Sequence, residues 1–417
     1  FGQDMDATTT NAPPKEWGGI LFGRGGMLTM LGLAGLAAWH GFHVAVFLAG
    51  TVLTLSVLAR AWSRAALARL VYARRLSARR AFPDETVDCT VHLDNRKILP
   101  LVWVHASERL PAALAPDPQD LPPGLSWSNG HLSVETSLLW YQRASWRYAL
   151  RCRRRGYYAV GPATVTSADI FGLFARSRRA PGIEHLAVFP RIHPLAELGL
   201  PSMSPLGEMR ASNPLFHDPV RIRGLRDYTP EVPFRHIHWK ASARTGQLQA
   251  KVFEPTSTTQ VMILLDGAAF TGGDGTLDEV GFELAVSVAA SLAWDVVQQR
   301  CSAGLCANTR LAGNGPSALL QPASGLDHLA DILESLARAR PQTVPFAALL
   351  EAIRPTIAAG TTLAVVTGRL RGDVDAILGD LHAQAFPVTV FLIGDAPTDD
   401  TALPCRRVRR PADLTLA

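Results

Sequence analysis

The hydrophobic residues of this chain follow three successive patterns, and the first is a pair of long apolar runs. Within residues 18–61, the runs Met27–Trp39 and Val44–Ala59 flank the short segment His40–His43. A helix on the surface of a soluble protein has a polar face, which these runs almost entirely lack. Because crossing ~30 Å of hydrocarbon takes about 20 helical residues, we predict a transmembrane helical hairpin. Each helix recruits flanking residues, and Arg24 reaches toward one membrane interface.

A row of arginines follows the apolar runs and orients the predicted hairpin. It contains no acidic residue and comprises Arg60, Arg64, Arg69, Arg74, Arg75, Arg79 and Arg80. By the positive-inside rule this flank faces the cytosol, which leaves the bulk of the chain cytoplasmic. Residues 62–80 then predict a basic juxtamembrane helix on anionic headgroups, with a solvated stalk as the alternative. A single span, or a buried helix pair in a soluble core, are the alternatives to the hairpin.

The second pattern is a series of short alternating runs over residues 81–194. Examples are Thr86–Leu93, Leu101–Val104, Trp146–Leu150 and Leu186–Phe189, with Pro, Gly and Asn between them. Such spacing is typical of an antiparallel β-sandwich or barrel, so we predict a β-rich, sandwich-like domain. The run Arg153–Tyr158 mixes basic and aromatic residues that could stack on nucleic acid, although a strand alternating between core and water is the favoured interpretation.

The third pattern, over residues 259–397, alternates strands with helices. Gln260–Asp266 is an apolar run that ends in an acid, as buried parallel strands do. Further strands are expected at Ala303–Ala307, Thr362–Thr367 and Val388–Ile393, and helices at Asp278–Arg300, Leu326–Ala339, Phe346–Arg354 and Asp373–Ala385. This alternation predicts right-handed crossovers and a doubly wound α/β sheet.

Charge changes the picture by separating this last domain from the rest. Residues 260–397 hold seven Lys or Arg against fourteen Asp or Glu, whereas the whole chain carries a net charge of +5. We therefore expect an acidic α/β domain beside basic surroundings, including a basic tail at 398–417. The five cysteines form no CxxC pair and are expected to be reduced structural thiols. The polar tail at 1–17 lacks the basic start of a signal peptide, so secretion is not indicated.

Residues 195–258 form a linker that carries the most distinctive motif of the chain. Its members are Arg226, Tyr228, Arg235, Ile237, Trp239, Lys240, Ser242, Ala243 and Arg244. Pro233 and Gly246 are suited to bound a helix over Arg235–Thr245. On that helix Arg235, His238, Trp239 and Ser242 are expected to share one face.

The chemistry of this motif favours anion recognition over metal binding. Arg226 and Arg244 offer planar forks for carboxylates or phosphate, and Trp239 offers a flat surface. His236 and His238 would point to different sides of the helix and lack acidic or Cys partners, so zinc is not expected. The favoured interpretation is structural, an Arg/acid network that locks the helix onto the following domain.

On these residues the chain resembles the bacterial membrane proteins that carry the domain of unknown function fifty-eight. The resemblance extends to Arg155–Tyr157 with Gly161–Pro162, to Asp169–Phe174 and to Phe189–Arg191. One departure is Glu231–Pro233, where the family usually has a Gly-Asp turn. The resemblance implies a membrane-tethered protein that works with a MoxR-type AAA+ ATPase, and it implies no known reaction.

The order of strands and helices resembles the von Willebrand factor A fold, whose first strand carries an Asp-x-Ser-x-Ser metal site. This chain keeps Asp266, but Ala268 and Phe270 take the serine positions and Thr367–Arg369 offers no acid. Because Mg²⁺ needs several oxygen ligands, we predict a degenerate metal-site position at Asp266, with no metal and no cofactor. Asp266 is then a helix cap or a relic. A P-loop, a dinucleotide fingerprint and a nucleophile elbow are also not found.

These observations favour a non-enzymatic, membrane-anchored interaction or assembly protein. Its α/β domain is expected to present its strand-end surface to protein partners, a MoxR-type ATPase among them. One alternative is an enzyme acting on an anionic substrate through Arg226, Arg235 and His238. Another is a nucleic-acid binder using Arg74–Arg80 and Arg151–Arg155, whose affinity would fall steeply with salt; nucleic acid is not the expected partner.

Overall fold

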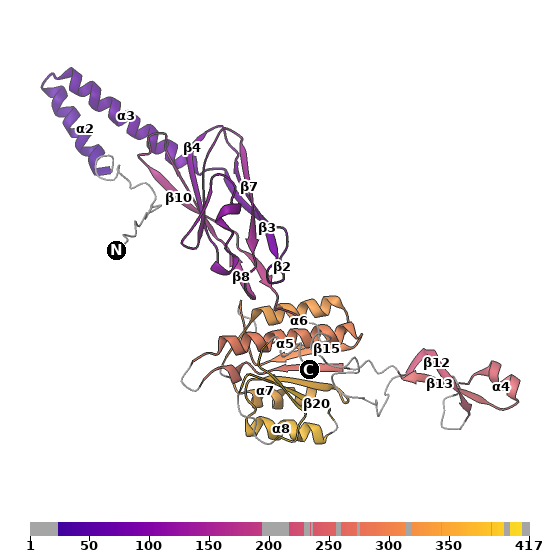
Figure 1. The fold of residues 1–417 in the computed structure, drawn as a ribbon. Helices are drawn as coiled ribbons and strands as arrows, with labels where there is room; N and C mark the ends of the chain where they lie inside the picture. The colour runs from indigo at the N-terminus through magenta and orange to yellow at the C-terminus, as the bar shows by residue number, and fades with distance from the viewer. Residues whose placement is uncertain are drawn as a thin grey trace. The chain divides into compact units, whose positions relative to one another are not determined.

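The computed structural model describes residues 24–193, 217–228, 234, 237–255, 260–272, 276–313, 318–342, 344–384, 386–395 and 401–410. The chain divides into two compact units, Phe1–Val188 and Phe189–Ala417 (Figure 1). Each unit has hydrophobic core clusters of its own.

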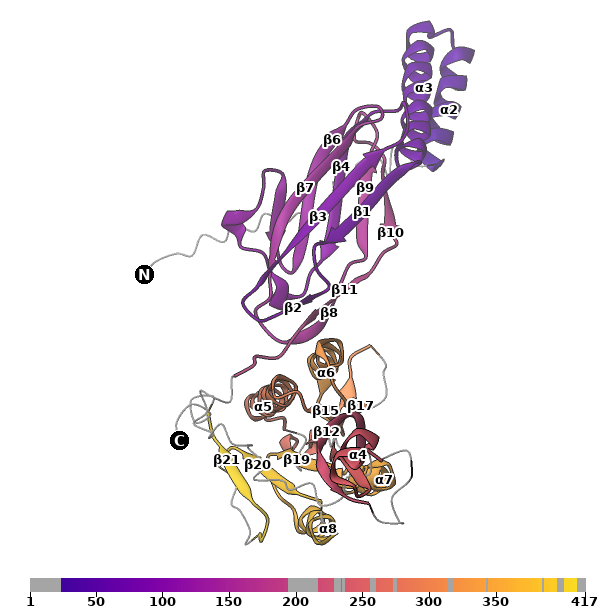
Figure 2. The ribbon, with the colours of Figure 1, turned by 90° about the vertical axis from the view of Figure 1, so that its right-hand side faces the viewer.

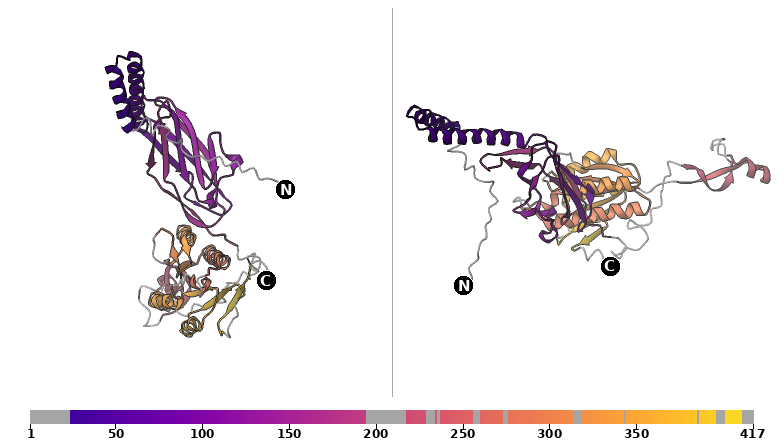
Figure 3. Two further views of the ribbon diagram at one scale, coloured as in Figure 1. Left: turned by 90° about the vertical axis from the view of Figure 1, so that its left-hand side faces the viewer. Right: turned by 90° about the horizontal axis from the view of Figure 1, so that it is seen from above.

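The first unit begins with two antiparallel helices, α2 (Arg24–Trp39) and α3 (His43–Ala66), which lie side by side in every view (Figures 1, 2 and 3). The expected apolar helix pair is therefore present. At 1.5 Å per residue, the 24 residues of α3 extend about 36 Å and the 16 of α2 about 24 Å. By length and composition α3 could cross a membrane, and α2 is a shorter apolar helix. The side chain of Arg24 lies outside the described residues.

Eleven described strands follow, and they form the predicted β-sandwich. They are β1 (Leu70–Leu76), β2 (Arg80–Ala81), β3 (Thr86–Asn95), β4 (Leu101–Arg109), β5 (Leu125–Ser128), β6 (His131–Leu138), β7 (Arg143–Arg151), β8 (Gly156–Val160), β9 (Ala163–Ala168), β10 (Ala175–Ala180) and β11 (Glu184–Val188). A sheet of order β1-β3-β7 faces one of order β10-β9-β4-β6-β5, and β2-β11-β8 forms a third sheet (Figure 2). Side chains from both larger sheets meet in the core, as Val91 of β3 and Leu132 of β6 do.

The predicted basic helix over residues 62–80 is wrong beyond its first turn. Helix α3 ends at Ala66, and Leu70–Leu76 is strand β1, paired antiparallel with β3. A strand is favoured because Leu70 is buried in the sandwich core and Tyr72 packs against that core, while Arg75 stays exposed. The sandwich therefore begins at Leu70, eleven residues before the expected boundary.

Arg74 of β1 points into the sandwich instead of toward lipid. Its guanidinium forms an ion pair with Glu108 of β4, and both side chains are almost fully buried. Tyr72 donates its hydroxyl proton to the same carboxylate, and the second guanidinium nitrogen donates to the carbonyls of Val160, at 2.6 Å, and Gly182, at 3.2 Å. Burial raises the pKa of Glu108, and Arg74 opposes that shift.

Glycine is required beside this ion pair. Gly161 has a φ of +95°, and a Cβ atom there would lie 2.7 Å from the carbonyl oxygen of Gly182 and 2.8 Å from a guanidinium nitrogen of Arg74. The strand after Gly161 can approach the guanidinium closely only because no side chain intervenes.

The second unit contains a two-stranded sheet and a six-stranded sheet. Strands β12 (His217–Asp227) and β13 (Gln249–Pro255) pair antiparallel and enclose helix α4 (Trp239–Thr245) between them in the sequence. The large sheet contains β14 (Gln260–Leu265), β15 (Ser302–Ala307), β17 (Leu319–Ala323), β19 (Thr362–Thr367), β20 (Val388–Ile393) and β21 (Cys405–Val408). Short β16 (Arg310–Leu311) and β18 (Ala339–Arg340) pair with each other.

The six-stranded sheet is doubly wound. Its order is β17-β15-β14-β19-β20-β21, and every pair is parallel except β15 with β17. Helices α5 (Glu279–Gln298) and α6 (Leu326–Arg338) cover one face, and α7 (Phe346–Ile353) and α8 (Gly372–Ala383) cover the other (Figure 1). Although α5 is long and apolar enough to span a membrane, 61% of its most apolar window is buried, as in the core helix of a soluble domain.

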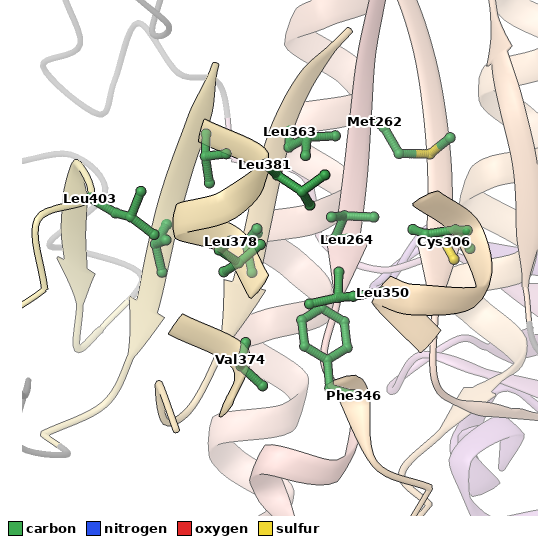
Figure 4. Close-up of a cluster of buried hydrophobic side chains, with 14 of the residues drawn as sticks. Met262, Leu264, Cys306, Phe346, Leu350, Leu363, Val374, Leu378, Leu381 and Leu403 are labelled. Atoms are coloured by element: carbon green, nitrogen blue, oxygen red, sulfur yellow. The ribbon is translucent and has the colours of Figure 1, made fainter. Parts of the chain in front are cut away.

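A tightly packed core lies between the sheet and the α7/α8 layer. Met262 and Leu264 of β14 and Leu363 of β19 belong to one buried cluster with Leu350 of α7 and Leu378 of α8 (Figure 4). The strands read as continuous apolar runs because both of their faces are covered.

The expected basic tail at 398–417 is partly wrong. Within it, Cys405–Val408 forms β21, which pairs in parallel with β20 and supplies the edge of the sheet. Only Val408 of this strand is buried, so its sequence lacks the apolar run that marks an inner strand.

The buried ion pair gives a test of the sandwich. Glu108→Ala removes the acid and leaves the Arg74 guanidinium without its charge partner in the core, so we expect unfolding of the sandwich to become easier by about 3–5 kcal/mol. Hydrogen exchange of peptides from β1 and β4 in the detergent-solubilised full chain measures this loss.

Asp88→Asn is the matched control, because the Arg147–Asp88 pair is exposed on the neighbouring strands. We expect no measurable change in exchange for it. Equal deprotection by the two substitutions would show that burial of the Arg74–Glu108 pair has no special consequence.

Candidate functional site

Three polar residues meet where neighbouring parallel strands end. Asp266 follows β14, Asn308 follows β15 and Thr367 ends β19. The carboxyl ends of parallel strands lie at one edge of a sheet, and the crossovers change direction between β14 and β19. Ligand sites of doubly wound sheets form at this point, so we take it as the candidate site.

The Asp266 carboxylate accepts four hydrogen bonds from the protein. One oxygen accepts from the backbone N–H of Ala268 at 3.1 Å, the N–H of Ala269 at 3.3 Å and the Asn308 amide at 3.2 Å. The other oxygen accepts from the Thr367 hydroxyl at 2.9 Å. Asp266 thus binds the first two N–H groups of the short turn η5 (Ala268–Phe270) and ties three strand ends together.

The Asn308 side chain extends this network. Its oxygen accepts from the Gly267 N–H at 2.5 Å, and its nitrogen also donates to the Val344 carbonyl at 3.0 Å. Burial raises the pKa of Asp266, while the hydrogen bonds from Thr367 and Asn308 oppose that rise.

An aromatic ring closes the edge above the network. Phe270 is 3% exposed and meets Phe282 edge-on, with ring centroids 5.9 Å apart. A Cβ atom at Gly368, directly after Thr367, would lie 2.9 Å from the Phe270 ring, so the ring rests on bare backbone.

This donor set does not fit a hard cation. Ala268 and Phe270 bring no side-chain oxygen, and both Asp266 oxygens accept hydrogen bonds from protein N–H and O–H groups. Mg²⁺ would need several oxygens in a near-octahedral array. Among the residues that the structure describes, no three His, Cys, Asp or Glu side chains are grouped to hold a metal ion.

Exposed apolar side chains lie around the closed edge. Leu277 and Val280 stand at the start of α5, where Asp278 caps the helix by accepting from the Gly281 N–H at 2.9 Å. Val344, whose carbonyl binds Asn308, is exposed as well. We call Leu277, Val280 and Val344 the carboxyl-edge patch; Val280, at 82%, is its most exposed member. The sequence does not predict this patch, because scattered single apolar residues carry no pattern.

The Arg/His/Trp motif folds differently from the expectation. Its helix begins at Trp239 rather than Arg235, with the ring of His238 accepting from the Ala241 N–H at 3.1 Å as the N-cap. The expected end at Gly246 is confirmed, with φ at 70°. Arg235 and His236, and the side chain of Arg226, lie outside the described residues.

Several motif residues have structural contacts. Ser242 donates to the His238 carbonyl at 3.1 Å and accepts from the Gln249 N–H at 2.9 Å, while Ile237 is buried in a bridge to Ala250. The Tyr228 N–H donates to the Leu248 carbonyl at 2.8 Å. By contrast, Trp239, Lys240 and Arg244 are exposed. Of the residues expected to share one helix face, His238 and Ser242 are hydrogen-bonded to each other, whereas Trp239 faces solvent.

The basic and aromatic run Arg153–Tyr158 enters strand β8. There the ring of Tyr157 stacks on His185 of β11 with centroids 4.9 Å apart, and the Tyr158 hydroxyl donates to the carbonyl of Arg154. Both rings have contacts within the sandwich, which agrees with the strand interpretation of this run.

Comparison with known proteins locates the family resemblance. A family model described as "Protein of unknown function DUF58" matches residues 224–404. The uncharacterized protein YeaD of Bacillus subtilis is 24% identical over 303 residues, 70% of each chain. The expected resemblance is thus confirmed for the motif and the α/β region.

Solved structures give only distant likeness. A cohesin of Archaeoglobus fulgidus has a TM-score of 0.19 at 11% identity, covering 27% of this chain and 92% of its own. A GH20 exo-β-N-acetylglucosaminidase of Vibrio harveyi has a TM-score of 0.23 at 8% identity, covering 81% of this chain and 86% of its own. At these scores the likeness carries no argument about this chain.

Two substitutions at Asp266 separate its hydrogen bonds from its charge. Asp266→Ala leaves the Asn308 amide and the Thr367 hydroxyl without this acceptor, and we expect a loss of about 3 kcal/mol in unfolding free energy. Asp266→Asn keeps an acceptor oxygen, and its new amide can donate to Thr367, whose hydroxyl turns to the Arg369 carbonyl 3.0 Å away. We expect a near-neutral effect, measured by hydrogen exchange in β14 and β19.

The raised pKa of Asp266 also predicts a pH dependence. A carboxyl whose folded pKa is raised stabilises the fold below its unfolded pKa and loses that contribution as pH rises through the folded pKa. The stability of the unaltered chain should therefore fall relative to Asp266→Asn across that window. A constant difference between the two chains would contradict the assignment.

Removal of divalent cations should leave the α/β unit unchanged, because the Asp266 oxygens already have protein donors. The melting temperature of the full chain, measured in chelator and in excess Mg²⁺, should be the same. A rise with Mg²⁺ that Asp266→Asn abolishes would contradict this account of the site.

Proposed function

We propose that this chain is a membrane-anchored interaction protein whose α/β unit binds a protein partner in the cytosol, and that the partner is an AAA+ ATPase of the MoxR type. The carboxyl-edge patch carries the proposal. At the edge where doubly wound sheets bind ligands, apolar side chains face solvent around a polar network that is satisfied within the protein. Such a surface suits contact with another protein better than binding of a small ion.

The anchor rests on the helix pair. Leu48 and Phe47 are among many large apolar side chains of α3 that face away from the protein, which water would disfavour and lipid would accept. The exposed arginines Arg64 and Arg69 at the end of α3 favour the cytosolic side for the sandwich and the inner membrane of a bacterium for the hairpin.

The α/β unit is proposed to be a von Willebrand factor A-like domain. Counted along the chain, its sheet has the order 3-2-1-4-5-6 with the third strand antiparallel, and Asp266 ends the first strand. The proposed MoxR-type partner is supported by the match of residues 224–404 to the family of unknown function. Members of that family are expected to work with MoxR-type ATPases.

A charged residue placed in the carboxyl-edge patch tests whether the patch contacts the partner. Val280→Glu should sharply reduce recovery of an AAA+ ATPase when the full chain is purified from its host in mild detergent, because a charge would be buried in the contact. The matched control is Leu326→Glu, which changes an exposed leucine at the start of α6, at the opposite edge of the sheet.

We expect the control to recover the ATPase as the unaltered chain does. Equal recovery by both variants would remove the patch from the contact. Repeated failure of the unaltered chain to recover any AAA+ ATPase would overturn the proposed partner.

A further inference from the structure

Three turns of the sandwich surround the end of α3. They are the β3–β4 turn at residues 96–100, the β6–β7 turn at 139–142 and the β9–β10 turn at 169–174. All belong to the first unit, so their placement beside α3 is part of one compact body (Figure 2).

The first turn is bonded to the helix end, and the second turn is bonded to the first. The Lys97 ammonium donates to the Ala66 carbonyl at 2.6 Å, and the Arg96 N–H donates to the Arg69 carbonyl at 3.0 Å. The Tyr141 N–H donates to the Lys97 carbonyl at 3.2 Å. These bonds fix both turns at the level where the apolar helix leaves the sandwich.

The third turn is fixed by an aspartate and an arginine. The carboxylate of Asp169 accepts from the Phe171 N–H at 3.0 Å and the Phe174 N–H at 2.6 Å. Arg60 of α3 lies over the Phe174 ring, 5.0 Å from its centroid. This contact joins the turn to the last part of α3.

The three turns hold large apolar side chains out into solvent. We call these residues the interfacial rim: Ile98, Leu139, Trp140, Tyr141, Ile170 and Phe171. Each is at least half exposed, although their own turns are rigidly bonded. Turns on a soluble surface usually carry polar residues, so six large apolar ones in three adjacent turns call for an apolar environment.

The charges around the rim have one predominant sign. Arg64 and Arg69 are exposed at the end of α3. Arg96 and Arg143 both bond to the single carboxylate of Asp94, at 2.9 and 3.0 Å. A positive surface interleaved with Trp and Tyr matches the headgroup region of an anionic bilayer, where aromatic rings and arginines accumulate.

We propose that the interfacial rim is seated in the headgroup layer of the bilayer, so that the sandwich is held against the membrane by its turns as well as by the hairpin. The inference rests on the proposed anchor, because the continuity of the rim with the apolar face of α3 selects lipid as the occupant. The rim sets the depth and tilt of the sandwich, and Trp140 and Phe171 enter the boundary between headgroups and acyl chains.

Trp140 reports on this seating. The full chain is reconstituted into vesicles of phosphatidylcholine and phosphatidylglycerol whose acyl chains carry bromine near the headgroup. The emission lost in Trp140→Phe isolates the signal of Trp140. We expect bromine to quench most of it and acrylamide in the buffer to leave it unaffected.

The matched control is Trp239→Phe, since Trp239 is similarly exposed but belongs to the second unit. Its isolated emission should be open to acrylamide and unaffected by bromine. The double substitution Ile98→Asp and Phe171→Asp should make Trp140 accessible to acrylamide and reduce its quenching by bromine, while the chain stays bound to the vesicles.

Each contrary outcome is distinct. If the chain floats with vesicles but Trp140 stays open to acrylamide, the rim is not seated and only the anchor survives. Shielding from acrylamide without bromine quenching would assign the rim to a protein contact and overturn the proposal. If the chain does not float with vesicles, the anchor fails and the rim proposal fails with it.

Discussion

The contact of Lys97 with the end of α3 is the constraint on which the rest of the first unit depends. A helix leaves its last carbonyls without partners, and a buried cation there satisfies one of them and suits the negative end of the helix dipole. Lys97 is supplied by a sandwich turn, and Asn95 accepts its second hydrogen bond at 3.0 Å. Since α3 then passes through a short turn into β1, the apolar helix and the sandwich act as one body.

In the α/β unit, a hydrogen-bond network joins the ends of three strands. Asp266, Asn308 and Thr367 come from three different strand ends, and each completes the hydrogen bonds of another. The network removes the free carboxylate that an open edge would present. The exposed side chains around this edge, Leu277, Val280 and Val344, are apolar.

Much of the fold was predictable where a local pattern decides the structure. The apolar helix pair, the alternating strands of the sandwich and the buried strands β14, β19 and β20 all follow from periodicity and burial. The strand β1 was not, because its arginine-rich sequence resembles a solvated helix until Glu108, 34 residues away, is known to pair with Arg74. Strand β21 was missed for a related reason, since an edge strand needs few apolar residues.

Only the first residue of the candidate site was identified from the sequence. Asp266 was identified from its place after a buried strand, whereas Asn308 and Thr367 were not recognised as its partners. The rule that carboxyl ends of parallel strands share an edge would have found both. The exposure of Val280 and of Trp140 could not be found in this way, because it depends on which neighbours the folded chain provides.

The seating of Phe270 on the backbone of Gly368 has one further consequence. The Phe270 ring is held by packing, and Gly368 beneath it has no side chain that could fill the space of the ring. Truncating Phe270 to alanine would open a hollow about the size of a benzene ring over the backbone of Gly368. An apolar cavity of that size binds benzene in other proteins, so the single substitution Phe270→Ala would give this domain a binding site for small aromatic molecules.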